Sequence, residues 1–231
     1  RHAPREFVGG QVDGPEAGVG QHGVPDGREG QQVAIRALEG SGVPVAAVAA
    51  GFPHGLSPLS ARLVEIEASV AVGAREIDAV LPRYLILRGD WKGLYEEVVA
   101  YRRACGHAHL KIILSTGELG SLENVYRTSL VCMMAGADFI KTSTGKEKVN
   151  ATLPVGLVMA EAIREYSHRT GYSVGLKPAG GIRESQEALA WLNLAGEKLG
   201  DAWTRPALFR IGASSLLSAL RRDLERHASG S

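Results

Sequence analysis

The sequence has few cysteines, few aromatic residues and no marked excess of charge of either sign. Only Cys105 and Cys132 occur in 231 residues, and their spacing is not that of metal ligands. A disulfide framework and a thiolate zinc site therefore have no support, and a reducing, cytoplasmic compartment is expected. The formal net charge of +1 argues against a mainly electrostatic role on nucleic acid or at a membrane surface, because such roles need a sustained basic excess.

The sequence also lacks long hydrophobic segments. No apolar run approaches the roughly 18 residues of a membrane span, and no charged and then apolar leader opens the chain. We therefore expect neither membrane insertion nor secretion. The apolar share of 45% is enough for one sizeable core, and the length suits a parallel α/β barrel that forms one domain.

Short apolar runs alternate with longer amphipathic stretches from about residue 43 onward, which is typical of βαβ units. The expected strands are 43–52, 76–81, 110–115, 138–144, 173–181 and 208–214. The expected helices after the first strand are 57–73, 91–105, 121–136, 152–170, 184–200 and 214–227. Each strand and helix together take about 30 residues, so the pattern favours most of a TIM-type (β/α)₈ barrel over an open sheet.

The first part of the chain follows a different pattern. Residues 1–31 are rich in glycine and proline and contain no sustained β-branched run, so we expect an irregular segment there. A helix over 32–40 would precede the first clear strand, and residues 32–231 would form the barrel domain. The match of GVGQHG (18–23) to a dinucleotide-binding pattern is a chance match, because no strand precedes it.

Four ionisable residues interrupt the apolar strands: Asp78, Lys111, Lys141 and Lys177. A charge in a strand covered on both faces costs several kcal/mol unless it is paired or solvated. Because side chains alternate along a strand, all four would point into the barrel. Their apolar neighbours would face the helices, and these are Ile77, Ile112, Ile140 and Leu176. The alternative is that one or two of the lysines lie at strand ends and reach solvent through their long side chains.

Two lysines and an aspartate inside a barrel suit Schiff-base chemistry. An amine is nucleophilic only when it is unprotonated, so such a lysine needs a pKa far below the usual value of about 10.4. Partial burial and a neighbouring cation both lower it. Lys141 and Lys177 lie on adjacent expected strands and face the same way. One would be the nucleophile and the other the neighbouring cation, while Asp78 would offset the charge and move protons.

Two loops have the composition of phosphate-binding sites. KPAGGIR (177–183) and IGASSLL (211–217) each lead from a strand into a helix, where backbone N–H groups are free. In barrels, the loops after the last two strands often hold phosphate. The donors expected there are Arg183, Ser214 and Ser215, with Gly145 and Lys146 nearby. The ordinary alternative is that Gly-Gly and Ser-Ser are simply good turn and N-cap residues.

No histidine has a convincing metal-binding context. His107 and His109 precede a strand with no third ligand in view, and a polar turn explains them better. His54, in the turn GFPHG (51–55), would line the barrel mouth or cap a loop. We therefore expect no metal site.

Five segments resemble deoxyribose-phosphate aldolase, in the same order and at similar spacing, within a stretch from about Val33 to His227. They are EIDAVL (76–81), LKIILSTGEL (110–119), GADFIKTSTGKE (136–147), VGLKPAGGIR (174–183) and FRIGASSLL (209–217). The resemblance implies a (β/α)₈ barrel that reversibly cleaves 2-deoxy-D-ribose 5-phosphate to acetaldehyde and D-glyceraldehyde 3-phosphate, without a cofactor.

The resemblance also implies a role for each matching residue. Lys141 would be the Schiff-base lysine, Lys177 the lysine that lowers its pKa and Asp78 the proton-transfer carboxylate. The residues implied or expected to contact the substrate or its phosphate are Lys111, Thr144, Gly145, Lys146, Gly180, Gly181, Arg183, Gly212, Ser214 and Ser215. Barrels of this kind are often dimeric, which leaves room for a homodimer.

The chain departs from the family pattern at both ends. The family has two strands before the run at 43–52, with an Asp in the first and a Cys in the second, and residues 1–31 reproduce neither. Family members commonly end in a tyrosine, whereas this chain ends HASGS. Two alternatives therefore stay open: a catalytically impaired barrel that still binds sugar phosphate, and a lysine aldolase acting on a keto acid.

Overall fold

The computed structural model describes residues 28–229, in which a parallel five-stranded sheet forms the centre. The strands lie side by side in chain order: β1 (Ala46–Ala49), β2 (Glu76–Val80), β3 (His109–Ile113), β4 (Phe139–Lys141) and β5 (Gly175–Lys177). Two isolated parallel bridges, Leu176 to Phe209 and Ala179 to Gly212, place a further extended segment beside β5. The alternation of strand and helix predicted from the sequence is confirmed.

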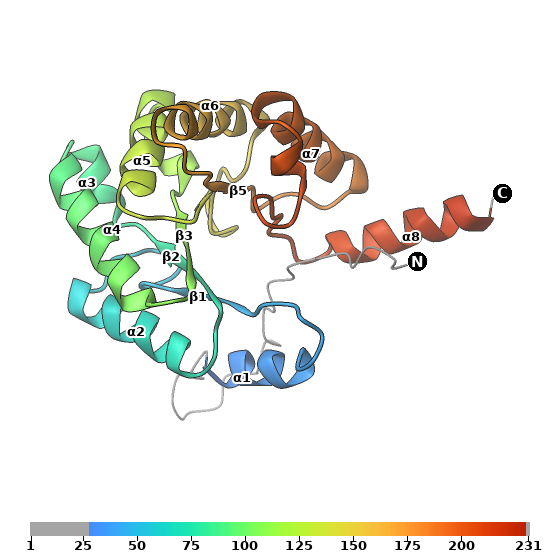
Figure 1. The fold of residues 1–231 in the computed structure, drawn as a ribbon, viewed down its shortest axis with the longest axis horizontal. Helices are drawn as coiled ribbons and strands as arrows, with labels where there is room; N and C mark the ends of the chain where they lie inside the picture. The colour runs from blue at the N-terminus through green and yellow to red at the C-terminus, as the bar shows by residue number, and fades with distance from the viewer. Residues whose placement is uncertain (1–27, 230–231) are drawn as a thin grey trace.

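Most of the helices lie on the outer side of the sheet. The helices of the described residues are α1 (Arg28–Ala37), α2 (Leu59–Ala71), α3 (Arg83–Leu87), α4 (Trp91–Cys105), α5 (Leu122–Met134), α6 (Leu153–Thr170), α7 (Ser185–Leu199) and α8 (Leu216–Ser229). Short 3₁₀ turns occur at Thr116–Glu118 and Asp201–Thr204. In Figure 1, α2, α4, α5, α6 and α7 form an arc around the strands, while α8 projects away from the rest. This arrangement is the wall of a (β/α) barrel.

Period-two alternation along the strands separates an apolar outer side from a charged inner side. Ile77, Ile112, Ile140 and Leu176 are fully buried in the core between sheet and helices, as predicted. The residues next to them in sequence therefore point inward, because successive side chains of a strand face opposite sides. The inner side carries the ionisable residues that form the candidate site.

The barrel is open between β1 and the segment that follows α7. Within residues 28–229, β1 pairs only with β2, and the bridged segment pairs only with β5. The inner side of β1 is accordingly accessible, since Ala46 is exposed and Val48 is half-buried while Ala47 and Ala49 are buried against the helix layer. The described residues thus form an incomplete barrel with two free sheet edges.

Two predictions about individual elements need correction, and one element was not predicted. Residues 28–31 were expected to be irregular, but α1 begins at Arg28, because tertiary contacts such as the Gln31 side chain bonding to the Ser69 carbonyl at 2.7 Å hold a helix there. The run 208–214 forms isolated bridges and no full strand, since no strand pairs with its other edge within residues 28–229. The short helix α3 was not predicted. The expectation for residues 1–27 lies outside the described residues.

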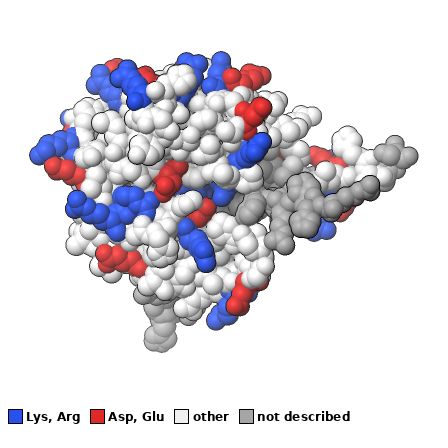
Figure 2. Space-filling view, in the orientation of Figure 1, with Lys and Arg blue, Asp and Glu red and all other residues white. Residues whose placement is uncertain are grey.

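Within residues 28–229, no helix is long and apolar enough to cross a membrane. Cys105 and Cys132 are both buried free thiols. On the face shown in Figure 2, basic and acidic side chains are interspersed among uncharged residues. With a formal net charge of +1, any preference for an anionic ligand is expected to come from a local site.

Candidate active site

A single aspartate joins two lysines in the interior of the barrel. Asp78 Oδ2 accepts hydrogen bonds from Lys141 Nζ at 2.8 Å and from Lys177 Nζ at 2.6 Å. Lys111 Nζ lies 3.4 Å from the other carboxylate oxygen, Asp78 Oδ1. The predicted convergence of all four residues is therefore observed.

Strand register accounts for this convergence. Asp78 of β2 lies opposite Lys111 of β3, and Lys141 of β4 lies opposite Lys177 of β5. The relative exposures are 2% for Asp78, 0% for Lys111 and Lys141 and 7% for Lys177. Lys141 and Lys177 do lie at the ends of β4 and β5, but their side chains are buried, so the alternative that one or two lysines reach solvent there is wrong.

Burial and a neighbouring cation lower the pKa of the Lys141 amine. Desolvation by burial is the largest cause that lowers the pKa of Lys141, to about 8, and the ammonium of Lys177 lowers it further. The Asp78 carboxylate acts in the opposite direction. The sequence pointed to both burial and the neighbouring cation, and the structure shows that burial is the larger of the two. About a tenth of Lys141 is thus unprotonated at pH 7, compared with well under a thousandth for an ordinary lysine.

Asp78 stays ionised in spite of its burial. Desolvation alone would raise its pKa, but the ammonium groups of Lys141, Lys177 and Lys111 outweigh that effect and hold the pKa well below the usual value. The carboxylate is therefore ionised and acts as the counter-ion of the buried lysines.

Two further charged residues belong to this interior cluster and were not singled out in the sequence. Glu76 Oε2 lies 2.5 Å from Lys111 Nζ, and Glu76 Oε1 lies 3.2 Å from Arg210 Nη2. Both could have been found in the sequence as the lysines were, because each is an ionisable residue within or beside an apolar strand. Glu76 stands two positions before Asp78 on the same side of β2, and Arg210 interrupts the apolar run 208–214.

The expected phosphate-binding loops meet beside the lysines. A Cβ placed on Gly145 would lie 3.8 Å from Gly180 Cα, so the loops after β4 and β5 are in contact. A Cβ placed on Gly212 would lie 2.7 Å from Ala179 Cβ and 3.5 Å from Lys177 Cε. Only glycine fits at this last position without displacing its neighbours. Three loops thus converge next to Lys177.

The donors on these loops differ in availability. The Thr144 N–H bonds to the Glu147 carboxylate at 3.0 Å, and the Arg183 N–H bonds to Glu187 Oε2 at 2.7 Å. These two N–H groups are therefore occupied by the protein itself. The side chains that are exposed at the rim and can reach a ligand are those of Lys146, Arg183, Ser214 and Ser215. Gly181 has an open surrounding, with no atom within 4 Å of a Cβ position.

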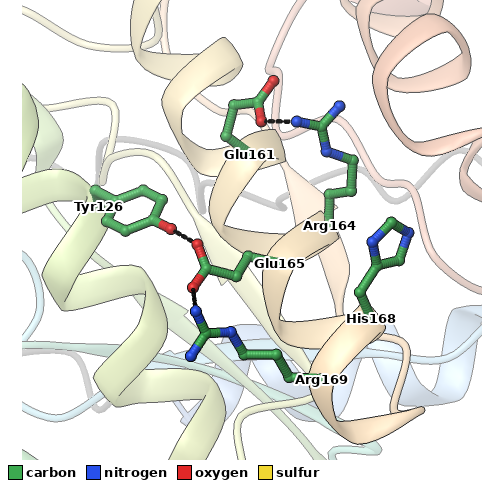
Figure 3. A pocket seen from close by; sticks show the side chains of 6 residues that line it. All are labelled: Tyr126, Glu161, Arg164, Glu165, His168 and Arg169. Atoms are coloured by element: carbon green, nitrogen blue, oxygen red, sulfur yellow. Dashed lines mark hydrogen bonds and ion pairs between the residues drawn. The ribbon is translucent and has the colours of Figure 1, made fainter.

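Other polar clusters lie away from this site. Between α5 and α6, a surface hollow is lined by Tyr126, Glu161, Arg164, Glu165, His168 and Arg169. Its side chains are joined in pairs, Tyr126 with Glu165, Glu165 with Arg169 and Glu161 with Arg164 (Figure 3). It lies on the outer helix layer and receives no residue from the strands. Among residues 28–229, no group of three His, Cys, Asp or Glu side chains is arranged to hold a metal ion.

Comparison with known proteins gives a consistent result. The family model for DeoC/LacD family aldolases matches residues 43–222. The chain is 60% identical over 199 residues to a deoxyribose-phosphate aldolase of Mus musculus and 57% identical over 199 residues to that of Homo sapiens. Each match covers 85% of this chain and 63% of the relative, so the chain spans less than two thirds of these relatives' length.

Solved structures agree with the sequence matches. QR15, an aldolase, superposes with a TM-score of 0.71 at 27% identity, covering 87% of this chain and 80% of that chain. The deoxyribose phosphate aldolase of Aeropyrum pernix superposes with a TM-score of 0.64 at 25% identity, covering 84% of this chain and 74% of that chain. The chain belongs to the DeoC/LacD family of aldolases, and residues 28–229 form most of a TIM-type barrel.

Proposed function

We propose that this protein is a deoxyribose-phosphate aldolase that reversibly cleaves 2-deoxy-D-ribose 5-phosphate to acetaldehyde and D-glyceraldehyde 3-phosphate. The proposal rests mainly on one observation: Lys141 Nζ and Lys177 Nζ both donate hydrogen bonds to the same oxygen, Asp78 Oδ2. This geometry supplies a buried amine of lowered pKa, a neighbouring cation and a carboxylate within one cluster. The names of the mouse and human relatives favour this substrate over a keto acid.

The proposed reaction begins with attack of the unprotonated Lys141 amine on the aldehyde carbon of the open-chain sugar. Loss of water gives an iminium ion, which serves as an electron sink. Asp78, directly or through water, takes the proton from the 3-hydroxyl, and the bond between the second and third carbons breaks. The electron pair of this bond passes to the iminium ion, which becomes an enamine, and D-glyceraldehyde 3-phosphate is released. Protonation and hydrolysis of the enamine then release acetaldehyde and regenerate Lys141.

The proposed reaction is tested by reductive trapping. Borohydride added with 2-deoxyribose 5-phosphate should leave a covalent adduct on the peptide that contains Lys141, identified by mass mapping. Lys141→Ala should abolish both the adduct and the cleavage. Lys198→Ala, which alters an exposed lysine of α7, serves as the matched control and should keep both. Unmodified wild-type protein, or cleavage that survives Lys141→Ala, would end the proposal.

The phosphate would be held by the loops that meet beside Lys177. We expect Lys146→Ala, at an exposed position, to raise KM for 2-deoxyribose 5-phosphate by about 10- to 100-fold, since one charge-assisted contact contributes about 1.5–3 kcal/mol. The KM for unphosphorylated 2-deoxyribose should not change. Steady-state kinetics with both sugars measures the difference, and an equal effect on the two substrates would contradict a phosphate contact.

A second candidate function is a barrel that binds sugar phosphate without turnover. The exposed donors on the loops beside Lys177 would allow binding even if Lys141 formed no Schiff base. Calorimetric binding of D-glyceraldehyde 3-phosphate by protein that forms no adduct and cleaves no substrate would establish that function.

The assembly and location of the protein are also proposed. The relative from Aeropyrum pernix is described as tetrameric, which supports a homo-oligomer, with a homodimer as its smallest form. Buried free thiols at Cys105 and Cys132 suit a reducing compartment, and the cytoplasm is the proposed location. Light scattering of the purified chain measures the assembly, and a monomer at all concentrations would contradict it.

A further inference from the structure

The two oxygens of Asp78 have unequal surroundings. Oδ2 accepts hydrogen bonds from Lys141 and Lys177, whereas Oδ1 is buried and has no hydrogen-bond partner among residues 28–229. A buried carboxylate oxygen without a partner is costly, and such atoms concentrate at functional sites. Oδ1 therefore receives no hydrogen bond from the lysine cluster and has only the longer ion pair with Lys111.

One cation lies close enough to occupy that acceptor. Lys111 Nζ is 3.4 Å from Oδ1, beyond the usual length of a charge-assisted hydrogen bond, and its side chain is fully buried. A stronger partner on the other side of the ammonium accounts for this gap. That partner is Glu76, whose Oε2 lies 2.5 Å from Lys111 Nζ.

Glu76 is itself held in place. Its second oxygen accepts a hydrogen bond from Arg210 Nη2 at 3.2 Å, and its side chain is buried. The Phe139 ring lies beneath both cations, with its centroid 5.7 Å from Lys111 Nζ and 5.6 Å from Arg210 Cζ. Arg210, Glu76, Phe139 and Lys111 thus form a connected set, the Glu76 clamp, that reaches Asp78 from the segment after α7.

We infer that Glu76 is a positioning residue of the reaction, which holds the Lys111 ammonium away from Asp78 Oδ1 and so keeps that oxygen free to accept the proton. This inference rests on the proposed function and deepens it. The proton moves from the substrate hydroxyl, or from a water bonded to it, to Oδ1, and the electron pair of the broken carbon–carbon bond passes to the iminium on Lys141. Glu76 touches no reacting atom and acts through Lys111.

The first test is structural and does not depend on activity. Glu76→Gln keeps the size of the side chain and removes its charge. In a crystal structure of this variant, Lys111 Nζ should move from 3.4 Å to about 2.8 Å from Asp78 Oδ1. If Lys111 remains with Gln at position 76 and the gap to Oδ1 is unchanged, the inference is overturned. Glu76→Asp, which keeps the charge on a shorter side chain, should show the same movement and replaces Glu76→Gln if that variant does not fold.

The second test separates adduct formation from cleavage. Glu76→Gln should lower kcat by at least about tenfold, less than the roughly 10²–10⁴-fold contribution of a general base because Asp78 itself remains, while KM and the borohydride adduct on Lys141 are retained. Glu165→Gln is the matched control, because Glu165 is also paired, with Tyr126 and Arg169, but lies in the hollow between α5 and α6. It should keep the wild-type kcat. Equal loss of the adduct and of kcat in Glu76→Gln would indicate a merely structural role.

A double-mutant cycle identifies Lys111 as the intermediary. If kcat falls in Glu76→Gln because the Lys111 ammonium is no longer held by Glu76, then adding Glu76→Gln to Lys111→Met should cause no further loss of kcat. Additive losses would overturn the inference. Wild-type protein that forms no adduct and cleaves no substrate would instead refute the proposed function, and the position of Lys111 in the Glu76→Gln crystal would still decide whether Glu76 holds it.

Discussion

At the scale of single residues, burial and charge oppose each other around Lys141. Burial lowers its pKa, Lys177 adds to that effect, and Asp78 resists it. The balance leaves the pKa at about 8, where both the free amine and the ammonium are present near neutral pH. Because removal of either neighbour shifts this balance in a known direction, the roles of Lys177 and Asp78 can be measured separately.

Lys177→Met should raise the pKa of Lys141, because a neighbouring cation is lost while the Asp78 carboxylate remains. The free amine then becomes scarce at pH 7, so the acid limb of the pH profile for borohydride trapping should move to higher pH. Trapping at pH 7 should fall about tenfold for each pH unit that the limb moves, with recovery at alkaline pH. The rate of trapping against pH measures this. An unmoved limb, or one moved to lower pH, would show that Lys177 does not depress the amine.

At the scale of elements, close contact between helices sets which substitutions the barrel wall accepts. Gly156 of α6 faces the Trp191 ring of α7, and a Cβ there would lie 2.2 Å from a ring carbon. Gly30 of α1 has open space around it, with no atom within 4 Å of a Cβ position. The same change from glycine to alanine should therefore have opposite effects in these two helices.

Gly156→Ala should destabilise the protein by about 1–3 kcal/mol through overpacking, which lowers Tm by roughly 2–4 °C per kcal/mol for a domain of this size. Gly30→Ala should stabilise it by about 0.4–1 kcal/mol, because alanine favours the helix and loses less backbone entropy. Thermal unfolding of both variants followed by circular dichroism measures the shifts. A Gly156→Ala variant as stable as the wild type would show that Trp191 can move aside at little cost.

At the scale of the whole molecule, the described residues leave both edges of the parallel sheet unpaired. A free edge offers unpaired backbone groups to solvent or to another chain. The inner strands β3 and β4 have a neighbour on each side, whereas β1 has one neighbour only. Backbone stability should therefore be graded across the sheet, from the centre to the open side.

Hydrogen exchange measured by mass spectrometry should show this gradient. Amides of β1 and of residues 209–212 should exchange at least about tenfold faster than those of β3 and β4, because edge regions open with a smaller free energy. Equal protection of β1 and β3 would show that another segment pairs with the free edge and closes the barrel. Adding inorganic phosphate should slow exchange in the loops that hold Gly145 and Gly180 if these loops bind it.

The sequence by itself determined the class of fold and the core of the site. Alternating apolar strands and amphipathic helices can bury their apolar surface only as layers, and a charge inside such a strand must find a partner. These two constraints are local, so Asp78, Lys111, Lys141 and Lys177 could be assigned to one interior from spacing alone. The start of α1 and the weak pairing of residues 208–214 could not be predicted from the sequence, because they depend on contacts with distant segments.

Only the tertiary structure decided which atoms meet. Alternation gives the direction of a side chain but not the register between strands, and register is what brings Lys141 and Lys177 to one oxygen of Asp78 and leaves the other free. It also joins Glu76 to Arg210, 134 positions later in the chain. The curvature of the sheet brings such residues together although they are far apart in the sequence. Their effects on each other's pKa values therefore exist only in the folded protein.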